Sequence, residues 1–133
     1  MKKQGTILTG PDRSGKSLIA NTIGEILGGD EVMYFDGRGK WKNKSHTFSM
    51  CERTTKCIVI DDIYDIENIN YFISYTEGIM VNKKSEPPFN LNPYIILIFD
   101  SEITKKDLIE KYSLIELRFE IIDLTHITPE SLK

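Results

Sequence analysis

One segment near the start of the chain constrains its fold more than any other. The residues GPDRSGKS, at positions 10–17, match the pattern G-x-x-x-x-G-K-[ST] in full. An apolar run at 6–9 precedes them, and a run with helical periodicity at 16–27 follows. Strand, glycine-rich loop and helix are the context in which this pattern binds phosphate. We therefore predict a phosphate loop, the alternative being a glycine-rich turn with an incidental lysine.

Each residue type in this loop has a chemical reason. Glycines allow backbone shapes that a Cβ would obstruct, so that successive N–H groups can wrap an anion. Lys16 would reach the outer phosphates, and the Ser17 hydroxyl would bind Mg²⁺. Arg13 points either at phosphate or at solvent. The residues predicted to contact ATP are Gly10, Pro11, Asp12, Arg13, Ser14, Gly15, Lys16, Ser17 and Leu18.

Strand-like and helix-like runs alternate along the rest of the chain. Strands are predicted at 6–9, 31–35, 57–60, 94–99 and the second half of 114–124, and helices at 16–27, 66–77, 104–110 and, shorter, within 46–56. A hairpin with a basic tip is predicted at 78–89. This alternation is typical of a three-layer α/β/α domain with a mainly parallel five-stranded sheet, which we expect to span residues 1–133 as a P-loop NTPase domain.

Two consecutive carboxylates follow the apolar run at 57–60. A buried strand would deliver Asp61 to its carboxyl end, beside the phosphate loop, where it would orient Mg²⁺. Asp62, one residue further on, would hold and deprotonate an attacking water. Aspartate also ends many strands for purely structural reasons, so this prediction depends on the phosphate loop upstream.

Composition excludes several classes of protein. The net charge of −3 argues against a surface that grips nucleic acid everywhere, although it permits a local basic element. No apolar run approaches the roughly 20 residues that a membrane span needs, and the one after the basic N-terminus is too short for a signal peptide. The two cysteines fit a reduced compartment, and we expect a cytoplasmic protein without membrane contact.

Three segments, CIVIDDIYD, EGIMVNKKSEPPF and NPYIILIFDSE, together resemble the motor core of superfamily 3 helicases, compact members of the AAA+ group. The shared features are the acidic strand end, a hairpin with a basic tip, and a buried strand that ends at a polar sensor. The resemblance spans about Ile7 to Leu124. It implies an ATPase that couples hydrolysis of Mg-ATP to action on single-stranded nucleic acid.

The resemblance also implies roles for single residues. Asp100 matches the polar sensor near the γ-phosphate; the family usually has Asn there, so either its role is altered or Ser101 serves instead. Arg118 matches an arginine presented to the ATP of a neighbouring subunit, the alternative being a surface arginine. Lys83 and Lys84 match the hairpin residues that contact a single strand, the alternative being a solvated turn.

One departure from the helicase family concerns what precedes the motor core. Family members usually carry an origin-binding or oligomerisation segment, whereas here the phosphate loop begins at Gly10. We therefore expect a bare motor that forms a homo-oligomeric ring, depends on a partner protein for targeting, or has lost unwinding.

Two other functions compete with this interpretation. The loop GPDRSGKS also resembles that of thymidylate kinase, but over only about ten residues, and the arginine-rich lid of such kinases is missing after Tyr94. The third alternative is a module that binds nucleotide and switches between partners without turnover.

Overall fold

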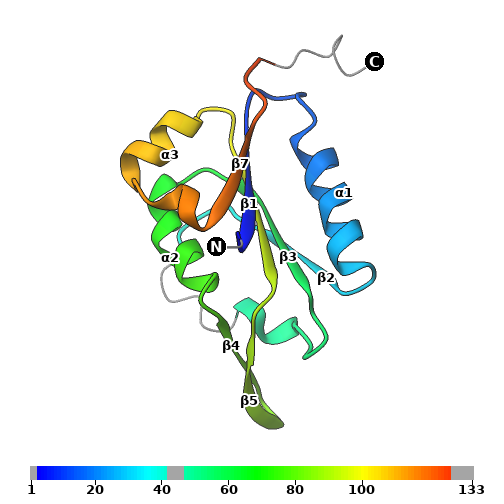
Figure 1. The fold of residues 1–133 in the computed structure, drawn as a ribbon. Helices are drawn as coiled ribbons and strands as arrows, with labels where there is room; N and C mark the ends of the chain where they lie inside the picture. The colour runs from blue at the N-terminus through cyan, green and yellow to red at the C-terminus, as the bar shows by residue number, and fades with distance from the viewer. Residues whose placement is uncertain (1–2, 42–46, 127–133) are drawn as a thin grey trace.

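The computed structural model describes residues 3–41 and 47–126 of the chain. They form an α/β structure with a five-stranded sheet and a small two-stranded sheet (Figure 1). The strands are β1 (Gly5–Thr9), β2 (Val32–Asp36), β3 (Cys57–Ile63), β4 (Ile79–Lys83), β5 (Glu86–Leu91), β6 (Tyr94–Phe99) and β7 (Phe119–Asp123). The helices are α1 (Lys16–Gly28), α2 (Ile69–Tyr75) and α3 (Lys105–Lys111), with 3-10 turns η1 (Thr47–Met50), η2 (Ile66–Asn68) and η3 (Ile115–Leu117).

The larger sheet has the strand order β2-β3-β6-β1-β7, and every neighbouring pair is parallel. Its inner strands β1, β3 and β6 are the continuous apolar runs of the sequence, and residues such as Ile7, Ile60 and Leu97 are fully buried. Strands covered on both faces show this pattern, because neither face needs polar side chains.

Helices cover the two faces unequally (Figure 1). Helix α1 lies on one face, where Ala20 packs with Leu8, Val59 and Ile96. Helices α2 and α3 lie on the other face over a larger apolar cluster, to which they contribute Phe72 and Leu108. This cluster continues into the root of the β4–β5 hairpin, and so joins the hairpin to the body.

An aromatic group centred on Trp41 fills the space between α2 and η1. The Trp41 ring meets Phe72 edge-on at 5.3 Å between centroids, and Phe48 meets Tyr75 in the same way at 4.9 Å. Edge-to-face pairs of this kind add to the gain from burying apolar area. The Trp41 backbone N–H donates to the Asn68 side chain at 3.0 Å, which satisfies a polar group inside this cluster.

The parallel sheet separates the molecule into two ends. The carboxyl ends of β1, β3 and β6 meet at one edge, next to the start of α1, and the β4–β5 hairpin projects from the opposite edge (Figure 1). Residues that follow these three strands are therefore brought together although they are far apart in sequence.

The predicted α/β class and parallel five-stranded sheet are confirmed, and most predicted elements agree to within a few residues. The predicted end of strand β3 is wrong: the sequence indicates an end at Ile60, but the strand continues through both aspartates to Ile63. The short helix expected within 46–56 is only the single turn η1, and His46 lies outside the described residues. None of the helices in the described ranges has the length and apolar character that a membrane span requires.

Candidate functional site

The segment between β1 and α1 has the backbone shape that its glycines predict. Gly10 has φ 139°, and Gly15, the residue before α1, is left-handed with φ 92°. A Cβ on Gly10 would lie 2.9 Å from that of Leu124, so a side chain there would force the loop away from β7. Arg13 has φ 64°, a conformation that costs a residue with a side chain about 1–3 kcal/mol and that gathers at functional sites.

Lys16 folds back over this loop. Its Nζ donates to the Gly10 carbonyl oxygen at 2.6 Å, in a partly buried setting. The ammonium group therefore lies between the two ends of the loop and bonds a neutral oxygen rather than a carboxylate. An anionic ligand in the loop would offer this ammonium a stronger, charge-assisted partner.

Ser17 and Asp61 meet across the gap between α1 and β3. The Ser17 hydroxyl donates to Asp61 Oδ2 at 3.3 Å, although the two residues are 44 positions apart. The structure thus brings together the two side chains that the sequence proposed as Mg²⁺ ligands.

A bulge in β3 gives the two neighbouring aspartates different surroundings. The register against β6 shifts between Ile60 and Ile63, and Asp62 takes φ 59°. The Asp62 backbone N–H donates to Asp61 Oδ1 at 2.7 Å, which holds the Asp61 side chain toward Ser17. Asp61 is half-buried and Asp62 is exposed, so solvent reaches the Asp62 residue more freely.

Asp100 arrives at the same place from the end of β6. Its backbone N–H donates to the Ile63 carbonyl oxygen at 2.8 Å, and its carboxylate accepts from Glu102 N at 3.2 Å. The carboxylate is therefore held by a turn beside the two aspartates. Ser101, its proposed substitute, lies in the wall of a different pocket of about 280 Å³, together with Gly10 and Pro11.

These residues surround a pocket of about 300 Å³ at the carboxyl edge of the sheet. Its wall consists of Asp12, Arg13, Gly15, Lys16, Ser17, Leu18, Asp61, Asp62, Tyr64, Ile98, Phe99 and Asp100. Carboxylates outnumber cations in this wall, so a polyanion would bind with an additional cation to balance the charge. A clustering of opposed charges in a cleft is typical of functional sites.

Ser14 is a loop residue that does not reach the pocket. It is 1% exposed, and its Oγ lacks a hydrogen-bond partner among the described residues. A buried hydroxyl in this state costs about 1–3 kcal/mol. The buried Ser14 hydroxyl and the strained backbone at Arg13 therefore both lower the stability of the fold in this loop conformation.

The sequence interpretation missed three residues next to this pocket. Tyr64 is 54% exposed in the pocket wall, and the nearby Asp62 charge raises the pKa of its phenol. Arg38 donates to Asp36 at 2.6 Å, and this bond raises the pKa of the guanidinium. Asp36 lies opposite Asp61 in the β2–β3 register. Tyr64 could have been noticed because it follows the aspartates by two residues, but Asp36 and Arg38 depend on knowing that β2 pairs with β3.

The donor set of the pocket suits Mg²⁺ held mainly by a ligand's own oxygens. Among the described residues, no group of three or more histidines, cysteines or carboxylates is arranged to hold a metal. One hydroxyl and one carboxylate, those of Ser17 and Asp61, face each other. Mg²⁺ commonly takes one or two protein ligands of this kind and completes its shell with phosphate oxygens and waters.

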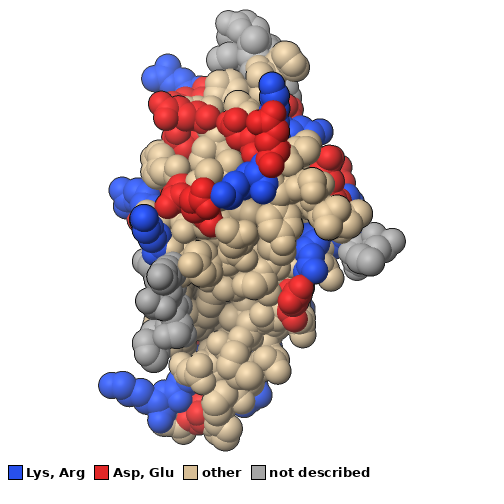
Figure 2. All heavy atoms as spheres, turned by 90° about the vertical axis from the view of Figure 1, so that its left-hand side faces the viewer, with Lys and Arg blue, Asp and Glu red and all other residues tan. Residues whose placement is uncertain are grey.

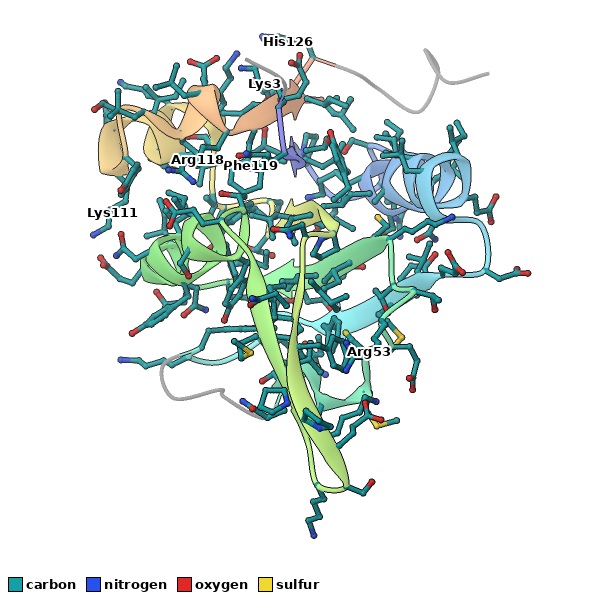
Figure 3. The ribbon with its side chains drawn as sticks, turned by 60° about the horizontal axis from the view of Figure 1, so that its bottom comes forward. Lys3, Arg53, Lys111, Arg118, Phe119 and His126 are labelled. Carbon is teal, nitrogen blue, oxygen red and sulfur yellow. The ribbon has the colours of Figure 1, made fainter. Side chains whose placement is uncertain are left out.

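The hairpin lies at the other end of the molecule, and its two lysines differ. Lys83 pairs with Glu52 at 3.2 Å and is 19% exposed, so it is not part of a freely solvated tip. Lys84 is exposed in the turn between β4 and β5. Figure 2 shows blue side chains at the hairpin end of the molecule and a denser group of charged side chains in the upper half. Arg53, beside the hairpin in Figure 3, lies over the Phe89 ring at 4.3 Å.

Arg118 is also far from the pocket of its own chain. It precedes β7, at the amino edge of the sheet, next to Phe119 (Figure 3). Its guanidinium donates to Glu77 Oε1 at 2.8 Å and to Thr76 Oγ1 at 2.9 Å. A role in the site of another subunit stays a prediction, and within this chain the residue ties β7 to the end of α2.

The sequence profile of a family of unknown function, DUF5906, matches residues 8–111. The chain belongs to this family. The matched range contains every residue of the pocket wall, together with the hairpin and α3, and ends before Arg118 and β7. None of the curated proteins matches the chain.

Proposed function

We propose that this DUF5906 member binds Mg-ATP in the pocket between the phosphate loop and β3, and that it hydrolyses the γ-phosphate as the motor core of a helicase-like, AAA+-type P-loop ATPase. The observation that carries the proposal is the bond between the Ser17 hydroxyl and Asp61. A phosphate-loop hydroxyl and a strand-end carboxylate are the pair that holds Mg²⁺ in P-loop enzymes. The position of the pocket adds support, because ligands of open parallel sheets bind outside the carboxyl ends of the strands.

The roles follow from what each side chain contacts. Lys16 would exchange the Gly10 carbonyl for a phosphate oxygen, and the backbone N–H groups at the start of α1 would face the same anion. Ser17 and Asp61 would hold Mg²⁺, which would neutralise charge on the phosphates. Asp62 is the exposed carboxylate of the pair, and it would orient the attacking water and accept its proton. Asp100, or Ser101 in its place, would sense the γ-phosphate.

The action on nucleic acid is the second part of the proposal. Lys84 at the hairpin turn, and Lys83 once released from Glu52, would contact a single strand. The hairpin root belongs to the same apolar cluster as β3 and β6, the strands that end at the pocket. A displacement of the strand ends on hydrolysis would therefore reach the hairpin through packed side chains. A homo-oligomeric ring or a partner protein would then hold the strand against it.

Nucleotide binding and turnover test the proposal. Calorimetry with Mg²⁺ and a non-hydrolysable ATP analogue should give one site per chain, and phosphate release from ATP should rise when single-stranded DNA or RNA is added. Lys16→Ala should weaken binding of the analogue at least ~100-fold, about 2.7 kcal/mol, because a charge-assisted bond to phosphate is lost. Lys106→Ala is the matched control, since that lysine is exposed on α3 and pairs with Glu110 at 3.9 Å.

The same experiments identify the alternatives. Transfer of phosphate to a nucleoside monophosphate would favour a small kinase, and tight binding with negligible turnover would favour a nucleotide-dependent switch. If calorimetry with the intact chain detects no uptake of the analogue, the proposal is wrong.

A further inference from the structure

The polar cluster Thr9–Asp123–Thr125 lies where the phosphate loop leaves the sheet. Thr9 is the last residue of β1, and Asp123 is the last residue of β7; the parallel register places them side by side. The Thr9 hydroxyl donates to Asp123 Oδ1 at 3.1 Å. The backbone N–H of Thr125 donates to the same oxygen at 3.1 Å, and the Thr125 hydroxyl donates to it as well.

The cluster is continuous with the loop itself. Gly10 follows Thr9 directly, and the backbone N–H of Leu124 donates to the Thr9 carbonyl oxygen at 2.8 Å. Leu124 packs so closely on Gly10 that a Cβ there would not fit, and the Gly10 carbonyl is the resting partner of Lys16. The position of the end of β7 therefore fixes where the loop begins and where Lys16 rests.

We infer that Asp123 is a positioning residue: by accepting from Thr9 and Thr125 it ties the edge strand β7 to the residue that directly precedes the phosphate loop. Thr9 is fully buried, so its hydroxyl needs an acceptor, and Asp123 is the one that the register supplies. Where the inference concerns ligand affinity, it rests on the proposed function; where it concerns the shape of the loop, it does not.

The carboxylate is suited to this task because it only accepts. The Thr125 hydroxyl bond, with smaller contributions that include Thr9 and His126, lowers the pKa of Asp123 below its ordinary value of 3.8. The group is thus ionised at neutral pH, and hydrogen bonds to charged groups are stronger than those between neutral ones. His126, which Figure 3 labels just beyond β7, lies on the same side.

Hydrogen exchange of the loop amides tests the shape of the loop without any ligand. In Asp123→Ala, the amides of Gly10 and residues 12–16 should exchange at least about tenfold faster than in the wild type, because the start of the loop is released. Asp123→Asn keeps an acceptor oxygen, so its exchange should stay within about threefold of wild type. Thr9→Val combined with Asp123→Ala should be no worse than Asp123→Ala alone, because the buried hydroxyl that lost its acceptor is gone.

Glu77→Gln is the matched control at the other end of β7. It weakens the ion pair that Arg118 makes just before that strand, and it leaves the Asp123 end intact. If Glu77→Gln accelerates loop exchange as much as Asp123→Ala does, or if Asp123→Ala leaves it unchanged, the inference is wrong.

Affinity for the Mg²⁺-ATP analogue provides the second readout. Asp123→Ala should weaken binding about tenfold, and Asp123→Asn should restore most of it. If the wild type binds no analogue but the Asp123 variants show the expected exchange pattern, the proposed function is wrong and the positioning role is supported. A wild type that binds the analogue, with Asp123→Ala binding equally well and its loop exchanging no faster, would support the proposed function and overturn the positioning role.

Discussion

The carboxyl edge and the amino edge of the five-stranded sheet carry charged groups in contrasting arrangements. At the carboxyl edge, Lys16 bonds a carbonyl oxygen and Asp61 accepts from a hydroxyl, so neither group is neutralised by an opposite charge in these contacts. At the amino edge and the hairpin, Arg118 pairs with Glu77 and Lys83 pairs with Glu52. The groups at the carboxyl edge can still bond a charged ligand. The ion pairs at the other end already neutralise each other and contribute to the stability of the fold.

The strain in the backbone follows the same division. Within residues 3–41 and 47–126, the residues with side chains and a left-handed backbone are Arg13 and Asp62, and both lie in the pocket wall. The hairpin end is held instead by buried apolar side chains, among them Val81 and Phe89. Strained backbone conformations of this kind gather at functional sites, whereas the hairpin end is stabilised by close packing.

Substitution of Asp61 should have the largest effect on phosphate release. A small effect would contradict the contrast drawn between the two edges of the sheet. Asp61→Asn keeps the shape of the side chain but removes the charge, so phosphate release should fall at least ~100-fold, about 2.7 kcal/mol of transition-state stabilisation. Glu52→Gln applies the same chemical change at the hairpin end and should leave basal phosphate release without nucleic acid within about twofold. Equal effects at the two ends would contradict the assignment of the pocket.

Gly37 tests how the carboxyl edge is built. A Cβ at this position would lie 2.6 Å from the Asp61 carbonyl oxygen and 2.6 Å from Ile63 Cγ1. Gly37→Ala should therefore destabilise the fold by about 1–3 kcal/mol and also weaken Mg-nucleotide binding, because it displaces the backbone that carries Asp61. Gly24→Ala in α1 is the control: its Cβ would meet ordinary contacts of 3.6 Å, and it should stabilise the helix by about 0.5–1 kcal/mol. Urea unfolding measures the stability, and calorimetry measures the affinity for Mg-nucleotide. Normal affinity in a destabilised Gly37→Ala variant would mean that the end of β2 does not help to position the site.

The sequence predicts different parts of this arrangement with different success. The loop at positions 10–17 could be predicted between a strand and a helix because its residues are consecutive, and Ser17 and Asp61 could be expected together because parallel strands end at one edge. The bulge at Asp62 was missed because two aspartates after an apolar run indicate a strand end, not a strand that continues. The pairing of Lys83 with Glu52 was missed because it joins side chains that are 31 positions apart, which no local pattern encodes.

Substitution of Arg118 should have a smaller effect, on stability. It tests whether this residue serves the fold alone or also ATP turnover. Arg118→Ala removes the pair with Glu77 and one bond to Thr76, whose hydroxyl still donates to the Ile73 carbonyl oxygen at 2.6 Å. The free energy of unfolding should fall by about 1 kcal/mol, because the side chain is one-third exposed and solvent screens the pair. Glu77→Gln should lose a similar amount of stability. A loss of ATP turnover in Arg118→Ala, without one in Glu77→Gln, would add the predicted role at the site of a neighbouring subunit.

The two hairpin lysines should show the smallest effect and the finest distinction. Lys84 is exposed, so Lys84→Ala should weaken binding of a single-stranded oligonucleotide about threefold and lower its salt dependence by about one counterion. Lys83→Ala should change affinity less, because Lys83 already bonds Glu52. Glu52→Gln removes that competitor and should strengthen binding slightly, in the direction opposite to the lysine substitutions. Fluorescence anisotropy at several salt concentrations measures all three, and equal losses for Lys83→Ala and Lys84→Ala would mean that the ion pair opens when a strand binds.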